Sequence, residues 1–386
     1  MAIVGAGAVT PLGGDVDAFW SGLITGVDGT SPIERFDVSD LRVWRGGEIK
    51  KLDAPHDAPR TECRATRLLI AAAADLRSRT EATCAPERLG VVVGTALGGV
   101  DELARALDGD RSARRALGGL YDSPAHGLAE WLGARGPVLT VSTACASGAT
   151  ALGVAADLLA AGAADVVIAG GYDVLCRFVM RGFDALRSLT RDRVRPFDRR
   201  RSGLLLGEAA ALVQLVNGRH ARPSTLLGCL LGHASTSDAF HVAAPHPEGR
   251  GLEHAIQSAM AMAGVTAGDV DFVSAHGTGT PLNDRVETAV LNRVLGPRAR
   301  AIPVNSIKGA LGHTMGAAAT LEAIMCLLAS QRGMVPQTLG WEERDPACDL
   351  DYVSGSPRAH RPRVSLSTSL GFGGCNAALV LEGAQG

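Results

Sequence analysis

Cys145 is the first residue whose position suggests chemistry, because its thiol could act as a nucleophile. Cys145 follows the strand-like run VLTVST (138–143) and opens an Ala-rich helical stretch, ASGATALGVAADLL. A thiol at a helix N-terminus lies at the positive end of the helix dipole, which favours the thiolate. Small neighbours, including Ala144 and Gly148, leave room for a substrate. Position alone fits a buried structural thiol equally well, so the cysteine needs partners before it implies chemistry.

Two histidines stand at comparable turns. His276 ends the run VDFVSAHG and precedes the turn-rich loop GTGTPLND, while His313 opens the helical stretch that follows NSIKGALG. A helix N-terminus disfavours a protonated imidazole, so we expect His313 to be neutral and to donate one N–H. One thiolate and two neutral imidazoles suit attack on a thioester followed by stabilisation of an enolate. The alternative for each histidine is a structural role in a loop.

Alternating strand and helix patterns must position these residues. Short apolar runs rich in β-branched residues end near glycines or polar turns, and Ala/Leu-rich stretches of helical periodicity separate them. This alternation predicts an α/β protein whose sheet is buried on both faces. The predicted strands are 89–97, 138–143, 164–171, 210–216, 270–277, 302–308 and 377–382.

A weak internal repeat links the two helix starts. Residues 138–162 and 302–331 share one strand–turn–helix plan, and aligning Cys145 with His313 also aligns Gly148 with Gly316. Duplicated units predict two similar halves, 1–216 and 217–386, whose helix starts converge on one pocket. Chance similarity between two Ala-rich helices is the alternative.

The composition excludes several function classes. The 386 residues are 46% hydrophobic and 20% charged, with a net charge of −2, which is typical of a soluble globular protein and suggests no nucleic-acid or anionic-membrane partner. Eight cysteines form no CxxC pair, so we expect no metal. The sequence begins with no secretion signal, and Asp157 and Asp165 interrupt its longest apolar stretch. These features predict a cytoplasmic protein without a membrane span.

Several motifs, in order, resemble one known family. They are STACASG around Cys145, SAHGTGTPLND around His276, NSIKGALGHTMGAAA around His313 and GFGGCN at 371–376, with further similarity at 195–208 and 236–249. Across nearly its whole length the chain is similar to the β-ketoacyl-acyl carrier protein synthases, the ketosynthases of fatty acid and polyketide synthesis. The resemblance implies a thiolase-type fold, with two similar βαβαβαββ halves related by a pseudo-twofold axis.

The resemblance also implies catalytic roles for individual residues. The implied reaction needs no cofactor. Cys145 would be the nucleophile, and His276 and His313 would bind the malonyl thioester carbonyl and support decarboxylation. Lys308 would pair with Glu322 and order the His313 loop. Without the resemblance, these last two would be an ordinary surface lysine and a solvated helical glutamate.

Phe372 would be the gate over Cys145, and its backbone N–H would join that of Cys145 in an oxyanion hole. The chain departs from the family pattern nearby, since Leu370, Cys375 and Leu204 replace a common Phe, Thr and Phe. These changes leave the acyl chain and the reaction outcome open. A thiolase, which uses a second cysteine as base, is an alternative that the HGTGTP motif disfavours.

The resemblance implies decarboxylative condensation of an acyl group on Cys145 with a malonyl thioester, both delivered by acyl carrier protein. Two alternatives stay open: a non-elongating acyltransferase or cyclase of the same fold, and a silent partner subunit like a chain-length factor. The implied assembly is a homodimer, or a heterodimer with a related subunit. Arg60, Arg64 and Arg67 are the predicted carrier-docking residues, and the arginines of 191–201 are a second basic group. In-fold salt bridges are the alternative for that group.

Overall fold

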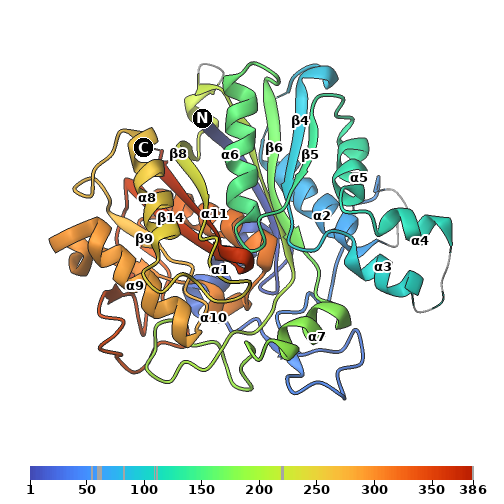
Figure 1. Cartoon of the computed structure of the whole chain (residues 1–386). Helices are drawn as coiled ribbons and strands as arrows, with labels where there is room; N and C mark the ends of the chain where they lie inside the picture. Colours follow the sequence, from blue (N-terminus) through green and yellow to red (C-terminus); the bar gives the residue numbers. More distant parts are fainter. Residues whose placement is uncertain are drawn as a thin grey trace.

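The computed structural model describes residues 1–53, 55–58, 63–80, 83–107, 109, 112–218 and 221–384, and its largest feature is a mixed eleven-stranded sheet (Figure 1). Two small two-stranded sheets flank it: β2 (Ser31–Pro32) with β3 (Arg45–Gly46), and β11 (Met334–Val335) with β13 (Arg358–Ala359). The large sheet joins the two halves of the chain.

One pairing pattern occurs twice in the large sheet. In the first half, two antiparallel pairings are followed by two parallel ones along β1 (Ala2–Val9), β7 (Ala209–Val216), β6 (Val166–Asp173), β4 (Leu89–Gly94) and β5 (Val138–Val141). The second half repeats this order along β8 (Gly228–Ser237), β15 (Cys375–Gly383), β14 (Val364–Gly371), β9 (Phe272–Ser274) and β10 (Pro303–Asn305), with β12 (Asp351–Tyr352) at its outer edge.

The helices form layers around these strands. A central apolar cluster contains α6 (Ser147–Ala160), α11 (Ala318–Arg332) and α1 (Val16–Thr25). The first-half sheet is covered on its other face by α2 (Arg64–Arg79) and α5 (Ser123–Leu132), and the second-half sheet by α8 (Arg250–Ala263) and α9 (Pro281–Leu295). These covering pairs lie on opposite sides of the molecule in Figure 1. Residues 318–330 of α11 are all buried, as expected of a helix that is apolar all round.

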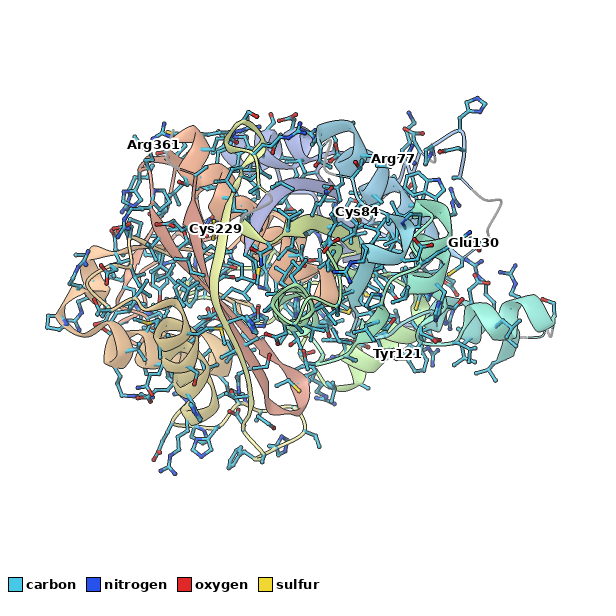
Figure 2. The ribbon with its side chains drawn as sticks, turned by 90° about the horizontal axis from the view of Figure 1, so that it is seen from above. Arg77, Cys84, Tyr121, Glu130, Cys229 and Arg361 are labelled. Carbon is cyan, nitrogen blue, oxygen red and sulfur yellow. The ribbon has the colours of Figure 1, made fainter. Side chains whose placement is uncertain are left out.

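Shorter helices complete the fold around the layers. They are α3 (Val100–Leu107), α4 (Ala113–Gly118), α7 (Arg177–Ala185) and α10 (Lys308–Leu311). None of the described helices is long and apolar enough to cross a membrane. All eight cysteines are free thiols, and Cys84 and Cys229 are half-buried on separate segments in the view from above (Figure 2).

The predicted α/β class and duplicated plan are confirmed, and each predicted strand occurs, several shortened at their ends. The sequence patterns missed three long strands, β1, β8 and β14, and the two-residue strands β2, β3, β11, β12 and β13. The halves meet where β1 and β8 pair through only two residues each, Ala2 with Cys229 and Ile3 with Gly228. A division into domains at residue 216 stays a prediction, because both halves share one sheet.

Candidate active site

Cys145, His276 and His313 line one cavity of about 340 Å³. Leu370, Phe372 and Leu204 contribute to its walls, so two of the three positions at which the chain departs from the family pattern, Leu204 and Leu370, border the cavity. The three reactive side chains come from distant parts of the sequence, as the pseudo-symmetric arrangement predicts.

A residue with positive φ precedes both Cys145 and His313. Ala144, just before Cys145, has a left-handed backbone (φ 50°), and Gly312, just before His313, is left-handed as well (φ 71°). A non-glycine residue in this region is uncommon. The turn at Ala144 is held by the Ser147 side chain, whose oxygen accepts a hydrogen bond from the Thr143 N–H at 2.9 Å.

Burial decides the protonation of Cys145. The side chain is 6% exposed, and burial, with a smaller contribution from the Asp173 carboxylate, raises the pKa of the thiol to about 12. The Lys308 charge and the backbone N–H groups of Phe372 and Cys145 act in the opposite direction. The predicted resting thiolate is therefore wrong, because desolvation outweighs the helix terminus, and α6 starts only at Ser147. The two N–H groups that point at the sulfur are the donors expected of the oxyanion hole.

Backbone hydrogen bonds on both sides fix His313. Its N–H donates to the Leu205 carbonyl at 2.7 Å, and its carbonyl accepts from the Gly207 N–H at 2.9 Å. Nδ1 accepts the Met315 N–H at 3.3 Å, which assigns the proton to Nε2. Nε2 is buried and has no hydrogen-bond partner among the described residues, and the residue lines the cavity. His313 can thus donate one N–H to a substrate oxygen.

His276 is fixed by a buried carboxylate. The backbone N–H groups of His276 and Gly277 donate to Glu287 at 2.7 and 2.9 Å, and the Thr368 hydroxyl donates to the same carboxylate at 2.6 Å. The His276 ring meets the His313 ring edge-on, with 5.2 Å between centroids. This arrangement holds the two imidazoles as a pair.

Both imidazoles are neutral. Burial lowers the pKa of His276 and His313 well below its usual value, and the Lys308 ammonium lowers it further. The expectation of a neutral His313 is confirmed, although the cause is burial and a nearby cation. His313 lies before the 3₁₀ turn Met315–Ala317, and α11 begins only at Ala318, so it does not open an α-helix.

Lys308 and Glu322 form a buried ion pair beneath the histidines. Lys308 Nζ lies 2.6 Å from Glu322 Oε1, and both side chains are almost fully buried. Burial raises the pKa of Glu322 to about 7, while the Lys308 charge opposes this rise. The structure brings together the pair that the resemblance implied.

Phe372 lines the cavity beside Cys145. Its ring stacks on Phe183 of α7, with centroids 5.4 Å apart. Gly371 packs against the Cys145 backbone, where a Cβ would lie 3.1 Å from the Cys145 nitrogen. The Phe372 ring thus lies at the cavity wall next to Cys145, on a loop with three glycines, where the predicted gate would have to lie.

Sequence reasoning missed the buried acids that support the site. Besides Glu287, Asp173 at the end of β6 accepts hydrogen bonds from the Thr95 hydroxyl and from the backbone N–H groups of residues 96, 97 and 316, at 2.6–3.1 Å. Burial raises the pKa of Asp173 to about 6. Asp284, one turn before Glu287, accepts the Gly279 N–H at 3.2 Å. The i, i+3 spacing of Asp284 and Glu287 after the HGTGTP motif was the available signal.

The three arginines predicted to dock the carrier have different surroundings in the structure. Arg60 lies outside the described residues. Arg64 is buried and bonds the Glu208 carboxylate through two nitrogens, at 2.9 and 2.6 Å, so its assignment to docking is wrong. Arg67 is half-buried on α2, and its docking role stays a prediction.

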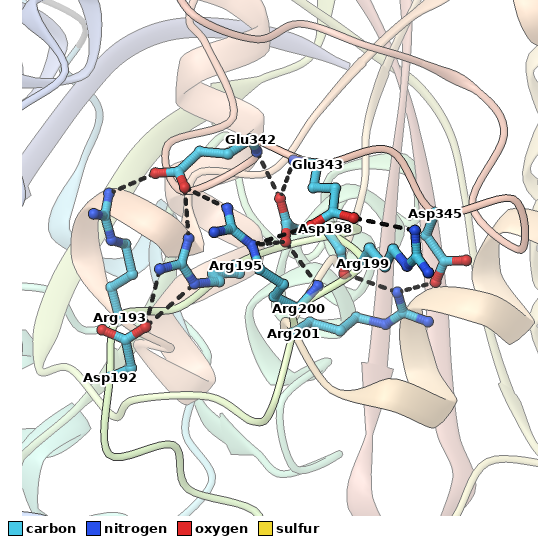
Figure 3. Close-up of polar contacts among 10 residues, drawn as sticks. All are labelled: Asp192, Arg193, Arg195, Asp198, Arg199, Arg200, Arg201, Glu342, Glu343 and Asp345. Carbon is cyan, nitrogen blue, oxygen red and sulfur yellow. Dashed lines mark hydrogen bonds and ion pairs between the residues drawn. The ribbon is translucent and has the colours of Figure 1, made fainter.

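The arginines of residues 193–201 are engaged within the fold (Figure 3). Arg193, Arg195 and Arg200 meet Glu342, Arg199 meets Glu343, and Arg201 meets Asp345. These ion pairs fasten one loop of the first half to one loop of the second. For the arginines of residues 193–201, salt bridges within the fold, the alternative to carrier docking, are therefore confirmed.

Comparisons with known proteins agree with this geometry. Residues 1–221 match the family model "Beta-ketoacyl synthase, N-terminal domain", and residues 227–342 match the corresponding C-terminal domain. The chain is 36% identical to a Synechocystis 3-oxoacyl-[acyl-carrier-protein] synthase 2 over 98% of this chain and 97% of that protein. It is 38% identical to the tetracenomycin polyketide synthase ketoacyl synthase alpha subunit of Streptomyces glaucescens, over 98% and 96%.

Solved structures give the same picture. The ishigamide ketosynthase/chain length factor superposes with a TM-score of 0.91 at 31% identity, covering 100% of this chain and 99% of that one. AntDE:AntF, a type II polyketide acyl-carrier protein in complex with its ketosynthase, superposes with a TM-score of 0.92 at 26% identity and the same coverage.

Proposed function

Because the chain belongs to the β-ketoacyl synthase family, the ketosynthases of fatty acid and polyketide biosynthesis, we propose that it performs a decarboxylative Claisen condensation. An acyl group would be held on Cys145 and joined to a malonyl group borne by acyl carrier protein. The observation that carries the proposal is the convergence of Cys145 with two neutral histidines in one cavity.

In the first half-reaction, the Cys145 sulfur attacks the carbonyl of an acyl thioester. The developing oxyanion accepts hydrogen bonds from the backbone N–H groups of Cys145 and Phe372, and such donors supply a large share of catalysis in acyl transfer. The bond from carbonyl carbon to carrier sulfur breaks, and the carrier leaves as a thiol with the proton that Cys145 loses. Since the resting thiol has a pKa of about 12, loss of this proton accompanies the attack.

In the second half-reaction, the malonyl thioester binds with its carbonyl oxygen facing the imidazoles. Nε2–H of His313, with His276 beside it, stabilises the enolate that forms as the carbon–carbon bond to CO₂ breaks. The enolate carbon attacks the acyl-Cys145 carbonyl, the Cys145 sulfur leaves and takes up a proton, and a β-ketoacyl thioester results. Neutral imidazoles can donate here without a general base.

The partners follow from the same proposal. Arg187 lines the cavity, is exposed, and forms no ion pair among the described residues, so it is available to an anionic carrier-linked substrate. The outer edge of β5 has no partner strand within the described chain, and its Leu139 is 40% exposed. An unpaired edge of this kind favours pairing with a second copy or a related subunit.

Release of labelled CO₂ tests the proposal. The protein is incubated with an acyl donor and [3-¹⁴C]malonyl-carrier protein, and CO₂ and the β-ketoacyl product are measured together. Both should form in equal amounts. Acyl-Cys145 that transfers to an alcohol or amine without CO₂ release would favour the non-elongating acyltransferase. Absence of acylation with every donor would favour a silent partner subunit.

A further inference from the structure

A strained residue lies next to the His276 loop. Phe197 has a left-handed backbone (φ 61°) and is 0% exposed. This conformation is a genuine outlier for a bulky side chain, and such outliers persist only where the surroundings enforce them. They concentrate at functional sites, so the contacts that enforce this one point to what it does.

The residue is held from two sides. Its backbone N–H donates to the buried Asp284 carboxylate at 2.7 Å. Its ring stacks on Tyr352, with centroids 4.3 Å apart and planes 17° apart, and the Tyr352 hydroxyl lies 2.7 Å from that of Thr288. The contacts come from α9 and from β12, both in the second half of the chain.

The next residue anchors the segment further. Asp198 is fully buried, and its carboxylate accepts the backbone N–H groups of Glu342 and Glu343 at 2.6 and 2.5 Å and that of Arg200 at 2.8 Å. The ion pairs around it fasten residues 193–201 to residues 342–345 (Figure 3). The segment that carries the Phe197 ring is therefore bonded to the second half through both backbone and side chains.

The ring presses on the peptide that follows His276. A Cβ placed on Gly277 would lie 2.6 Å from Phe197 Cε2, so only glycine fits between the ring and Ser306. Asp284, which holds the Phe197 N–H, also accepts the Gly279 N–H at 3.2 Å. Asp284 and the Phe197 ring thus hold the loop together with Glu287, which accepts the N–H groups of His276 and Gly277.

We propose that Phe197 is a positioning residue for His276: held left-handed by Asp284, its ring braces Gly277 and sets the His276 imidazole relative to His313. The inference rests on the proposed function, because it assigns the ring to the step in which the imidazoles meet the malonyl thioester. Cys145, on the first-half turn, is held by other contacts, so acyl loading does not depend on this brace.

The test separates the two half-reactions in Phe197→Leu. We expect malonyl decarboxylation to fall at least tenfold, while acylation of Cys145, followed by mass spectrometry, stays within about threefold of the parent. Phe272→Leu is the matched control, because Phe272 is equally buried and lies on the strand before His276, in another apolar cluster. This control should lose comparable stability and keep both rates.

A second readout does not depend on turnover. In protein labelled with ¹⁵N-histidine, the ring resonances of His276 should shift in Phe197→Leu and stay in place in Phe272→Leu.

If Phe197→Leu does not fold, Asp284→Asn is a second variant. It keeps one acceptor for the Phe197 N–H and should show the same selective loss of decarboxylation, smaller in size. Equal loss of both half-reactions, or an unmoved His276 resonance, would overturn the inference. A parent that releases no CO₂ would instead overturn the proposed function, whereas the resonance would still report the brace.

Discussion

Gly148 and Gly316 contact each other across the centre of the molecule, and they occupy matching positions in the two strand–turn–helix units. A Cβ on Gly148 would lie 2.6 Å from the Gly316 carbonyl oxygen and 2.8 Å from Thr320 Oγ1. Because the first contact is with backbone, a neighbouring side chain cannot simply rotate away. The pseudo-symmetry of the sequence is therefore realised as direct packing between its two copies, three residues after Cys145 and His313.

Gly148→Ala should force α6 away from the His313 turn. Overpacking of this kind typically costs ~1–3 kcal/mol, and we expect a loss of that order in urea unfolding, with slower acylation of Cys145. Gly182→Ala is the control, since no atom of the residues that the structure describes lies within 4 Å of its Cβ position, and it should stabilise helix α7 slightly. Equal stability of parent and Gly148→Ala would show that the helices can separate at no cost.

Acyl thioesters should modify Cys145, and Cys145→Ala should abolish transfer. Because burial raises the thiol pKa to about 12, alkylation by iodoacetamide should still be accelerating with pH at pH 9, with no plateau at neutral pH. Mass spectrometry of peptides after both treatments locates the adduct. An acyl group on Cys375, with Cys145 free, would contradict the assignment of the nucleophile.

His276→Ala and His313→Ala should still load an acyl group on Cys145 but lose CO₂ release by roughly 10²–10³, the usual effect of removing one oxyanion donor. The pKa of both imidazoles is lowered, so the neutral, active form persists as the pH falls through the usual histidine value of about 6.5. Condensation should therefore show no loss as the pH either falls or rises through 6.5. Parent-like decarboxylation in both variants would argue against elongation.

Asp173 should make stability depend on pH. Its folded pKa of about 6 lies above the unfolded value, so its contribution is present below about pH 4 and is lost as the pH rises to about 6. The parent's stability advantage over Asp173→Asn should shrink across that window by ~2–3 kcal/mol, at about 1.4 kcal/mol for each unit. Urea unfolding of both proteins at pH 4.5 and 7.5 measures this difference. If Asp173 does not titrate between these pH values, the difference in stability will be the same at both.

Arg187→Gln should raise the KM for carrier-bound substrate several-fold and leave that for a small N-acetylcysteamine thioester unchanged. The reason is that Arg187 lines the cavity and is exposed, whereas Arg191 is exposed without lining it. Arg191→Gln is thus the matched control for general surface charge. Equal effects of Arg187→Gln on the two substrates would remove its role in meeting the carrier.

The sequence predicted that Cys145, His276 and His313 share one pocket because each lies at a recognisable turn after a strand-like run. It could not show the protonation of Cys145, because burial depends on segments far along the chain. Arg64 illustrates the same limit: its carboxylate partner, Glu208, lies 144 residues away, and an arginine at a helix start otherwise reads as a surface charge. The burial of Asp173 could not be predicted for the same reason, because its donors lie at residues 95–97 and 316.

The missed strands have a local explanation. β8 (GCLLGHASTS) and β14 (VSLSTSLG) contain small and hydroxyl-bearing residues, whose patterns resemble loops, yet β14 is almost entirely buried. Its backbone pairs on both sides with β15 and β9, which compensates for weak side-chain preference. Tertiary context overrides local propensity in such strands.

The position of β15 has a consequence for how the protein is made. This strand, Cys375–Gly383, lies between β14 and β8, which it pairs on its two sides. A nascent chain that has reached only β14 therefore leaves β8 without its main partner strand, although α8 and α11 have already been made. Long-range strand pairings of this kind are slow to form and leave unpaired, aggregation-prone strand edges during synthesis. We expect the second half to acquire protease resistance only after β15 has emerged from the ribosome.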